Sequence, residues 1–384
     1  MNSNKKSFFT GVVFGMIALF VINSFVTNIG LLYKRFIAKD LTINQKTAQI
    51  ESIINKYYVN DYDEQLMEEM MYKGMIASLK DPYSYYMSEK ELKEFLDDTE
   101  GNYVGIGIMV NLTEDEKIHI NKVFDGSPAQ DSGLKEGDKI MKVEDKEVNL
   151  ENYQEVVSDI KGEEGTKVKL NIYREKENKT FNVEVLRKSL DVPTVEYKLL
   201  DDNIGYISIS QFDRVTYDQF KKAYDALNGS NGLIIDLRDN PGGLLTTVNK
   251  ITDMLVPEGT ITYIEDKQGN RDYHKSDANY YNKPLVILVN KNSASASEVL
   301  SGAVKDFGVG KLVGETTYGK GVVQNMYQLA DGSGVKITMA KYYTPSGVCI
   351  QGTGIEPDYK VTNPENSDKD LQLEKGIEVI KNWK

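Results

Sequence analysis

The sequence predicts a multidomain α+β protein, and three observations lead to this fold class. An uncharged apolar stretch lies near the N-terminus, short strands and turns fill the middle of the chain, and strands alternate with helices in its second half. With 384 residues and 40% hydrophobic content, the chain has room for two or three domains with full cores. The predicted segments are a tip and membrane helix at 1–35, a helical region at 36–98, a strand-rich domain at 99–189, a layered α/β core at 190–363 and a tail helix at 364–384.

The N-terminal stretch predicts a membrane anchor. Lys5 and Lys6 precede residues 7–33, which carry no charge. The stretch is long enough for a membrane-spanning helix, which needs about 20 residues. No small-x-small cleavage site closes it, so we expect an uncleaved signal anchor rather than a removed signal peptide. Lys34 and Arg35 make the far flank basic as well, so charge alone does not decide the orientation.

Residues 41–98 predict a pair of helices. Ile50, Ile53 and Ile54 share one helical face, and an apolar stripe rich in methionine follows. Such a stripe is most often core. Its members are Leu66, Met70, Met71, Met75 and Ile76. The segment Asp81-Pro-Tyr-Ser-Tyr-Tyr86 predicts the turn that ends this region.

The next two segments differ in how their strands are connected. Between residues 101 and 189 short strands alternate with turns, at 104–112, 117–123, 138–143, 167–174 and 180–186, with a helical stretch at 152–160. From residue 192 to 361 strands are interleaved with helices, and the strands are expected at 203–210, 232–237, 284–290, 311–315 and 335–343. This second pattern predicts a layered α/β core with antiparallel additions.

Ser295 is the candidate nucleophile. An apolar run opened by proline predicts a buried strand at 283–290, and residues 298–306 carry apolar residues at helical spacing. Ser295 in Asn290-Lys-Asn-Ser-Ala-Ser-Ala-Ser-Glu298 therefore lies at a strand-to-helix junction. The pattern Ser295-x-x-Glu298 also fits a capping box, so the simpler alternative is an N-cap serine that satisfies its own helix.

Lys320 is the candidate base. A serine hydroxyl is a poor nucleophile unless an adjacent base takes its proton, and lysine serves as a base only when it is neutral. Lowering a lysine pKa from roughly 10.4 to about 7 costs about 4 to 5 kcal/mol, which burial in an apolar, cation-poor pocket supplies. Lys320 lies between Gly319 and Gly321, which leave room for a close, dry approach. The alternative is an ordinary exposed lysine in a turn.

A glycine turn supplies candidate oxyanion donors. Residues 232–238 predict a buried strand, Asp239-Asn-Pro-Gly-Gly243 a sharp turn, and residues 244–256 a helix. Adjacent glycines at a helix entrance present backbone N–H groups to a developing oxyanion. The candidate donors are the amides of Gly242, Gly243 and Ala296. A Pro-Gly-Gly sequence is more often just a turn, but three such elements in one region are harder to explain as coincidence.

Other kinds of site fit the sequence poorly. A Ser-His-Asp triad needs His119 or His274, and a Cys-His pair needs Cys349 with one of them. His119 alternates in a strand pattern far upstream and His274 lies in a polar stretch, so we expect both to be solvated at the surface. Two scattered histidines and one cysteine predict no metal site, and no cofactor is expected. The net charge of −12 argues against nucleic acid as a partner.

Three segments together resemble the signatures of the carboxy-terminal processing peptidases, also called tail-specific proteases. They are Asp236-Leu-Arg-Asp-Asn-Pro-Gly-Gly243, Ser293-Ala-Ser-Ala-Ser-Glu298 and Gly319-Lys-Gly-Val-Val-Gln324. The resemblance implies a crotonase-like layered peptidase core, with Ser295 as nucleophile, Lys320 as base and Gln324 as the residue that orients the lysine. The alternative for Gln324 is a polar residue that alternates outward on a strand. Asn292 stands where many relatives have glycine, which leaves the shape of this loop open.

A second resemblance concerns the strand-rich domain. The sequence from Phe124 to Ile140 is similar to the core signature of PDZ domains, in which loop N–H groups hold a peptide's terminal carboxylate while the peptide adds to a sheet edge. Gly105, Ile106, Gly107 and Ile108 match that loop. Taken alone, a Gly-x-Gly sequence is weak evidence and usually marks a plain turn.

These resemblances imply a serine endopeptidase that recognises protein substrates by their C-terminal tails. We expect a single-pass protein of the cell membrane whose catalytic part lies outside the cytoplasm. A homodimer is also implied, with residues 36–98 contributing to dimerisation and capping, so the methionine stripe is a candidate partner surface. The alternative is a catalytically silent scaffold or receptor that keeps only the PDZ-like site. The joint presence of the serine, lysine, glutamine and glycine turn argues against it.

Overall fold

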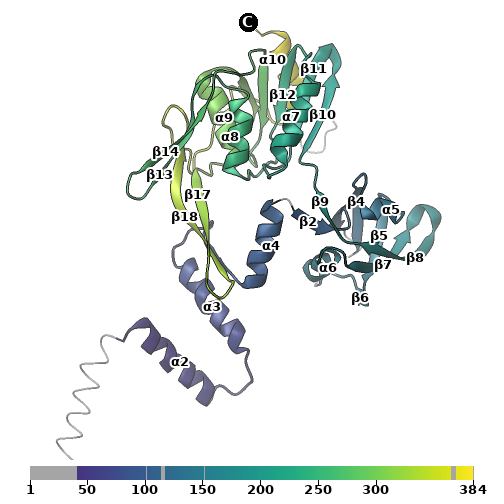
Figure 1. Cartoon of the computed structure of the whole chain (residues 1–384), viewed down its shortest axis with the longest axis vertical. Coiled ribbons are helices and arrows are strands. Elements are labelled where there is room, and N and C mark those ends of the chain that lie inside the picture. Colours follow the sequence, from purple (N-terminus) through teal and green to yellow (C-terminus); the bar gives the residue numbers. More distant parts are fainter. Residues whose placement is uncertain (1–40, 101, 114–116, 151, 365–368, 384) are drawn as a thin grey trace, which may run out of the picture. The chain divides into compact units, whose positions relative to one another are not determined.

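A computed structural model of the chain describes residues 41–100, 102–113, 117–150, 152–364 and 369–383 (Figure 1). The chain divides into two units, Met1–Glu68 and Glu69–Lys384. The expected membrane anchor at residues 7–33 lies outside the described residues. Within the described ranges, no helix combines the length and the apolar character needed to cross a membrane.

Two helices form in the region where helical spacing predicts them. They are α2 (Ile43–Tyr57), which begins with a capping box between Thr42 and Gln45, and α3 (Glu64–Ala77). Neither helix has a buried residue in the described part of the chain. Their exposed apolar side chains include Ile50, Ile53, Met70, Met71 and Met75. The methionine stripe is therefore not core in this structure, in contrast to the usual role of such a stripe.

The segment after α3 joins a sheet formed by strands much later in the chain. The turn at residues 81–86 leads into β1 (Tyr85–Met87), and α4 (Glu89–Glu100) follows. β1 pairs antiparallel with β18 (Gly334–Tyr343), and Tyr85 lies opposite Lys336. The N-terminal segment thus contributes one strand to the neighbourhood of the candidate base.

The strand-rich domain has a sheet of order β3-β4-β5-β7-β8, with β6 on β5 and a separate β2-β9 pair. Its core is lined by wholly buried Ile118, Ile140, Val168 and Val185. Among the described strands β3 pairs with β4 alone, so it is an edge strand. The elements are β2 (Asn102–Gly105), β3 (Ile108–Leu112), β4 (Ile118–Val123), α5 (Pro128–Asp131), β5 (Asp138–Val143), β6 (Lys146–Glu147), α6 (Tyr153–Ile160), β7 (Lys167–Arg174), η1 (Glu175–Glu177), β8 (Lys179–Leu186) and β9 (Lys188–Asp191).

The α/β core is built on a six-stranded sheet of order β10-β11-β12-β15-β16-β19. β10 is antiparallel to β11, and the other neighbours are parallel. Every residue of β12 and β15 is buried, as expected of parallel strands covered on both faces. The strands, with one 3-10 turn, are β10 (Val195–Leu200), η2 (Asp201–Asn203), β11 (Ile204–Ile209), β12 (Gly232–Asp236), β15 (Leu285–Val289), β16 (Lys311–Gly314) and β19 (Tyr359–Lys360).

Helices cover both faces of this sheet (Figure 1). α7 (Thr216–Ala226), α8 (Leu245–Asp253) and α9 (Ala296–Phe307) pack on one face, and α10 (Leu371–Lys381) packs on the other. Because β12 and β15 are parallel neighbours, the turn after β12 and the loop before α9 meet at the same edge of the sheet.

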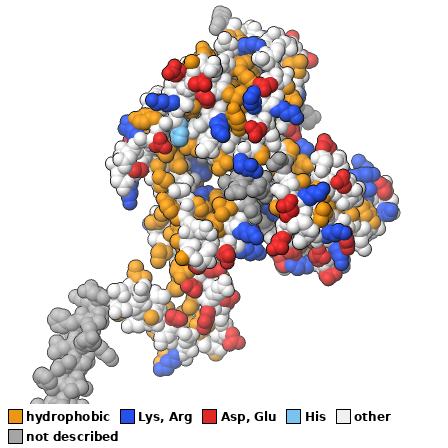
Figure 2. Space-filling model, viewed as in Figure 1, with side chains coloured by type: hydrophobic (Ala, Val, Ile, Leu, Met, Phe, Trp, Pro, Cys, Tyr) orange, Lys and Arg blue, Asp and Glu red, His pale blue; other side chains and the backbone are white. Residues whose placement is uncertain are grey.

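A second sheet of order β1-β18-β13-β14, with β17 on β18, completes the core. Its remaining strands are β13 (Gly259–Asp266), β14 (Arg271–Ser276) and β17 (Val322–Gln328). Figure 2 shows apolar side chains gathered over the β17-β18 ribbon, and the exposed apolar residues of these two strands include Tyr327 and Met339. The prediction of a mixed α/β protein with a layered core and antiparallel additions is confirmed.

Candidate active site

Ser295 occupies a strained position between β15 and α9. It is the N-cap of α9, with φ 55° and ψ −113°. Positive φ is uncommon for residues other than glycine, and a side chain held in a sparsely populated backbone region costs about 1 to 3 kcal/mol. The strand before it and the helix after it are both buried, so the surrounding structure imposes this conformation. Such strain is concentrated at functional sites.

The three serines of this loop differ in accessibility. Ser293 and Ser297 are wholly buried, and their hydroxyls donate to the carbonyls of Leu237 at 2.7 Å and Asn240 at 3.0 Å. Ser295 is partly exposed. A substrate carbonyl can therefore approach the Ser295 hydroxyl, whereas the other two hydroxyls are committed to the packing of the loop.

Glu298 joins the serine loop to the lysine loop. Its carboxylate is wholly buried and accepts from the Ser295 and Lys320 N–H groups through Oε2, at 2.8 and 2.9 Å. Oε1 accepts from the Thr317 hydroxyl at 2.6 Å and the Gly319 N–H at 2.8 Å. Burial raises the pKa of Glu298, against the lowering effect of these hydrogen bonds.

The sequence indicated only the contact between Glu298 and Ser295, through the capping-box pattern. The Glu298 half of the predicted capping box is present, because its side chain accepts the Ser295 N–H, while the Glu298 N–H donates to the Ser295 carbonyl. The link from Glu298 to the lysine loop was not predicted, because it depends on which loop lies across the carboxylate in space. The signal available in the sequence was the acidic residue of the Ser295-x-x-Glu298 pattern.

The glycine turn packs directly against Ser295. A Cβ placed on Gly242, whose φ is 109°, would lie 2.8 Å from the Cβ of Ser295. The main chain of Asn240 accepts the Ala294 N–H at 3.0 Å, which ties the turn to the serine loop. Asn292, the departure noted in the sequence, donates to Asp239 at 2.8 Å and adds a second link.

Two of the three candidate oxyanion donors remain available. The Gly242 N–H donates to the Asn240 side chain at 2.8 Å, so it is already used. The N–H groups of Gly243 and Ala296 have no acceptor among the described residues. The backbone N–H groups of Gly243 and Ala296 are therefore the two candidates left for the predicted oxyanion hole.

The side chain of Lys320 is half-buried and contacts an aromatic ring. Its Nζ lies 4.8 Å from the centroid of the Tyr83 ring. Burial and then the ammonium of Lys336 lower the pKa of Lys320, while the charges of Glu298 and Asp81 oppose this shift. In the described part of the chain, no hydrogen bond joins the Lys320 amine to the Ser295 hydroxyl.

Gln324 lies on β17, but its amide contacts a different partner from the one expected. Its Nε2 donates to the Thr338 hydroxyl on β18 at 3.3 Å. No hydrogen bond between Gln324 and Lys320 occurs among the described residues. Its role in orienting the lysine therefore stays a prediction.

The remaining candidate groups lie elsewhere. His119 is on β4 and His274 is on β14. Both were expected to be solvated, but each is only partly exposed, and Nε2 of His274 is buried without a hydrogen-bond partner among the described residues. Within the described ranges, no group of three or more His, Cys, Asp or Glu side chains is arranged to hold a metal ion.

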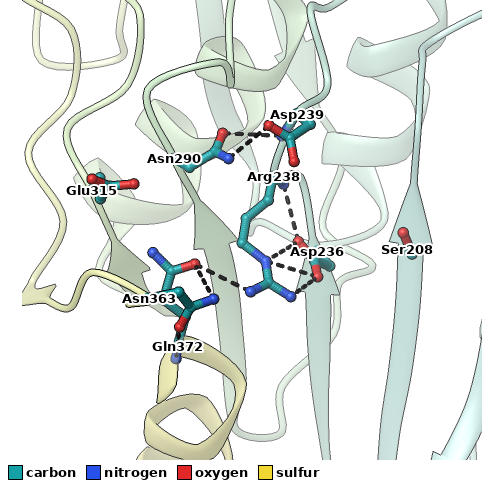
Figure 3. Close-up of a pocket in the computed structure, with 8 residues that line it drawn as sticks. All are labelled: Ser208, Asp236, Arg238, Asp239, Asn290, Glu315, Asn363 and Gln372. Carbon is teal, nitrogen blue, oxygen red and sulfur yellow. Dashed lines mark hydrogen bonds and ion pairs between the residues drawn. The ribbon is translucent and has the colours of Figure 1, made fainter. Parts of the chain in front are cut away.

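A polar cavity of about 270 Å³ lies at the carboxyl edge of the parallel sheet, toward α10 (Figure 3). Neither Ser295 nor Lys320 lines it. Arg238 crosses it, with ion pairs to Asp236 and to Asp370. Burial opposes ionisation of Asp370, but Arg238 lowers its pKa to about 2. This network ties α10 to the strand end that carries the glycine turn.

Three family models match successive parts of the chain. The model of peptidase family S41 matches residues 203–361, the PDZ domain model matches residues 104–185, and the model of the activating protease CtpB N-terminal domain matches residues 33–91. The first of these contains the serine loop, the lysine loop and the glycine turn.

Curated proteins and solved structures give the same grouping. Carboxy-terminal processing protease CtpA of Bacillus subtilis (strain 168) is 36% identical over 374 residues, covering 95% of this chain and 79% of the relative. CtpB of the same strain is 35% identical over 346 residues, with 88% and 72% covered. The structure of the photosystem II D1 C-terminal processing protease aligns with a TM-score of 0.51 at 30% identity, covering 84% of this chain and 87% of that one.

Proposed function

The chain belongs to the carboxy-terminal processing proteases of peptidase family S41, and from this premise we propose that Ser295 is its nucleophile and Lys320 its general base. That it is a serine-type peptidase follows from the family. The observation that supports these two residues is the shared carboxylate of Glu298, which accepts both the Ser295 and the Lys320 N–H groups. The two loops are therefore held side by side at the only open serine of the three described above.

The proposed reaction is acyl transfer through a covalent intermediate. The neutral amine of Lys320 takes the proton of the Ser295 hydroxyl as the oxygen attacks the scissile carbonyl. The N–H groups of Gly243 and Ala296 stabilise the oxyanion. Lys320 then gives the proton to the departing amine, and water attacks the acyl-enzyme by the same route.

The electrostatics around Lys320 support its role as a base. Its pKa is lowered by burial and by the ammonium of Lys336. A lowered pKa increases the neutral fraction of the amine at a given pH, and the neutral amine is the form that accepts a proton. In the structure the amine lies over the Tyr83 ring, and no hydrogen bond joins it to Ser295 among the described residues, so we infer that the side chain shifts before it acts.

We also propose that the PDZ domain binds the C-terminal tail of the substrate. The N–H groups of Ile106 and Gly107 have no acceptor among the described residues, and they directly precede the edge strand β3, to which a peptide strand can add. Gly107 has φ 83°, and a Cβ there would lie 2.3 Å from the Cβ of Ser127, so the loop requires glycine. Ile106 and Ile108 are 1% and 7% exposed and belong to the domain core, so the main chain carries this proposal.

The remaining proposals concern location and assembly. Residues 7–33 support a membrane anchor with an extracytoplasmic catalytic part, although they lie outside the described residues. The exposed methionines of α3 support a second copy of the chain as a partner. A silent scaffold is the alternative function, since the amine and the serine hydroxyl are not hydrogen-bonded to each other in this structure.

One experiment separates the enzyme from the scaffold. The purified full chain is incubated with an unstructured protein substrate, and the cleavage rate is compared with those of Ser293→Ala and Ser295→Ala. We expect Ser295→Ala to abolish cleavage and Ser293→Ala to retain it, at a stability cost of about 1 to 3 kcal/mol for the lost buried hydrogen bond. Cleavage by Ser295→Ala at the wild-type rate would remove Ser295 from the proposal.

A further inference from the structure

Tyr83 contacts the proposed base from a distant part of the chain. The Lys320 Nζ lies 4.8 Å from the centroid of the Tyr83 ring. An aromatic face attracts a cation within about 6 Å. Among the described residues the Lys320 amine makes no hydrogen bond, and the hydrogen bond of this residue runs from its main chain to Glu298. The ring is therefore the contact that holds the amine.

The turn that carries Tyr83 is fixed to β18. Asp81 accepts the Tyr83 N–H at 3.1 Å and the Ser84 hydroxyl at 2.5 Å. The Thr338 N–H, on β18, donates to the Ser84 oxygen at 2.9 Å. Ser84 is buried, so this lock is shielded from water. The position of the Tyr83 ring is thus set by strand pairing rather than by a free loop.

The same residue of β18 also engages Gln324. The Thr338 hydroxyl accepts from the Gln324 amide at 3.3 Å, while the Thr338 N–H holds the turn. The amine of Lys320 and the amide proposed to orient it are therefore each occupied by a separate contact. Both contacts belong to one assembly, made of the turn at residues 81–86 and β18.

We propose that the Tyr83 ring is the resting site of the protonated Lys320 amine, and that the turn at residues 81–86 holds the base off Ser295. This inference rests on the proposed role of Lys320 as base. The signs of the interactions agree with it, because a π face favours the cation whereas proton abstraction needs the neutral amine. Tyr83 and Asp81 therefore favour the protonated amine of Lys320, which is the resting form.

The other groups around Lys320 determine what a substitution in the turn changes. Lys336 on β18 favours the neutral amine, and Glu298 on α9 favours the charged one. Tyr318, in the same loop as Lys320, contacts the Tyr83 hydroxyl. Removing the ring, or the charge of Asp81, leaves these groups in place and shifts Lys320 toward its neutral form.

The pKa of Lys320 can be measured without any catalysis. The full chain carrying Ser295→Ala is labelled competitively with acetic anhydride across the pH range, and the Lys320 peptide is quantified by mass spectrometry. We expect Tyr83→Leu to lower the pKa of Lys320 by about 0.5 to 1 pH unit. Tyr83→Phe keeps the ring and leaves the value unchanged. Tyr359→Leu, which removes a ring 5.1 Å from the Lys375 amine, is the matched control and also leaves it unchanged.

A second variant keeps the test decisive if Tyr83→Leu does not fold. Asp81→Asn removes a charge that favours the protonated amine, so it also lowers the pKa of Lys320. No shift in whichever of the two variants folds would overturn the resting site, as would an equal shift in Tyr83→Phe.

Kinetics on the active chain complete the test. The acid limb of the kcat/KM profile moves to lower pH in Tyr83→Leu by the amount seen in labelling, whereas a merely structural role lowers kcat and leaves the limb in place. If Tyr83→Leu shifts the labelling pKa of Lys320 but not the acid limb of the kcat/KM profile, Lys320 is not the base. In that case both the proposed function and the proposed resting site are wrong. If neither the labelling pKa nor the acid limb shifts in a folded variant while Lys320→Ala is inactive, the proposed resting site on Tyr83 is wrong and the role of Lys320 as base still stands.

Discussion

At the scale of single residues, the environment of each polar group in the site assigns it a different task. Ser295 is strained and open, while Ser293 and Ser297 are buried and hydrogen-bonded within the loop. Glu298 is the residue on which both loops converge, since its two oxygens accept four hydrogen bonds. The chemistry proposed for Ser295 and Lys320 therefore depends on a side chain that touches neither reacting atom.

Replacing Glu298 by Gln tests that dependence. The amide nitrogen cannot accept, so one pair of buried N–H or O–H donors loses its acceptor, at a cost of about 1 to 3 kcal/mol. We expect a lower unfolding temperature and a fall in kcat, because the loops of Ser295 and Lys320 are no longer held by one group. Thermal unfolding and cleavage assays measure both effects. Glu356→Gln, at an exposed acid, serves as the control and should change neither. A Glu298→Gln protein with wild-type kcat would show that the carboxylate is dispensable.

Motifs could place Ser295 and Lys320 as candidates, but they could not supply their partners. Short segments such as Gly319-Lys-Gly-Val-Val-Gln324 identify residue types and order along the chain. The contact of Lys320 with Tyr83 joins segments that are far apart in sequence, and the pairing of β1 with β18 helps to bring them together. Gln324 contacts Thr338 for a similar reason, because the partner comes from the neighbouring strand.

At the scale of elements, the turn after β12 and the loop before α9 form the floor of the site. Parallel pairing of β12 with β15 brings their carboxyl ends together. Asn240 and Asp239 then connect the two segments through hydrogen bonds to Ala294 and Asn292. Close approach of the main chains is possible because Gly242 has no side chain.

Gly242→Ala tests this close approach. The added Cβ would lie 2.8 Å from the Cβ of Ser295 and from the carbonyl of Ala294, and φ is 109°. We expect the serine loop to shift and the cleavage rate to fall by at least tenfold. Gly269→Ala is the matched control, because Gly269 also has positive φ, at 84°, but its Cβ would meet open space. The control should lose about 1 to 2 kcal/mol of stability from backbone strain and keep its activity. Equal activity in the two variants would contradict the packing argument.

Apolar runs predicted the buried parallel strands well, while two strands of the second sheet were missed. β12 and β15 are continuous apolar segments, and their position in the core follows from burial on both faces. β14 was not expected as a strand, since exposed residues such as Asp272 and Lys275 interrupt the apolar pattern. β13 was not expected either, although its Ile261 and Tyr263 are buried. The pairing of these two strands is decided by neighbours in the second sheet, which local sequence does not show.

At the scale of the whole molecule, a PDZ domain and a peptidase core occur in one chain. The proposed division of labour is that the domain selects substrates by their C-termini and the core cleaves them. The N–H groups of Ile106 and Gly107, which have no acceptor among the described residues, give this proposal a chemical test, because their attraction for a carboxylate depends on its negative charge.

Amidation of the substrate tail is that test. A peptide ending in a free carboxylate and its C-terminal amide are titrated against the full chain carrying Ser295→Ala, so that no cleavage disturbs the binding measurement. We expect at least tenfold weaker binding of the amide, because a charge-assisted hydrogen bond contributes about 1.5 to 3 kcal/mol. Equal affinities for the two peptides would rule out capture of the carboxylate by this loop.

The central claim is that a neutral lysine accepts the proton of Ser295, and the pH dependence of cleavage tests it most directly. Because burial and Lys336 lower the pKa of Lys320, activity should rise with pH through an apparent pKa below the value of about 10.4 for a free lysine. Lys320→Arg should be inactive at every pH, since a guanidinium with a pKa above about 12 stays protonated. The measurement is the cleavage rate of one unfolded substrate from pH 6 to 10 for the wild type and Lys320→Arg. The account predicts a rising profile for the first and no cleavage by the second, and a fully active Lys320→Arg enzyme would contradict it.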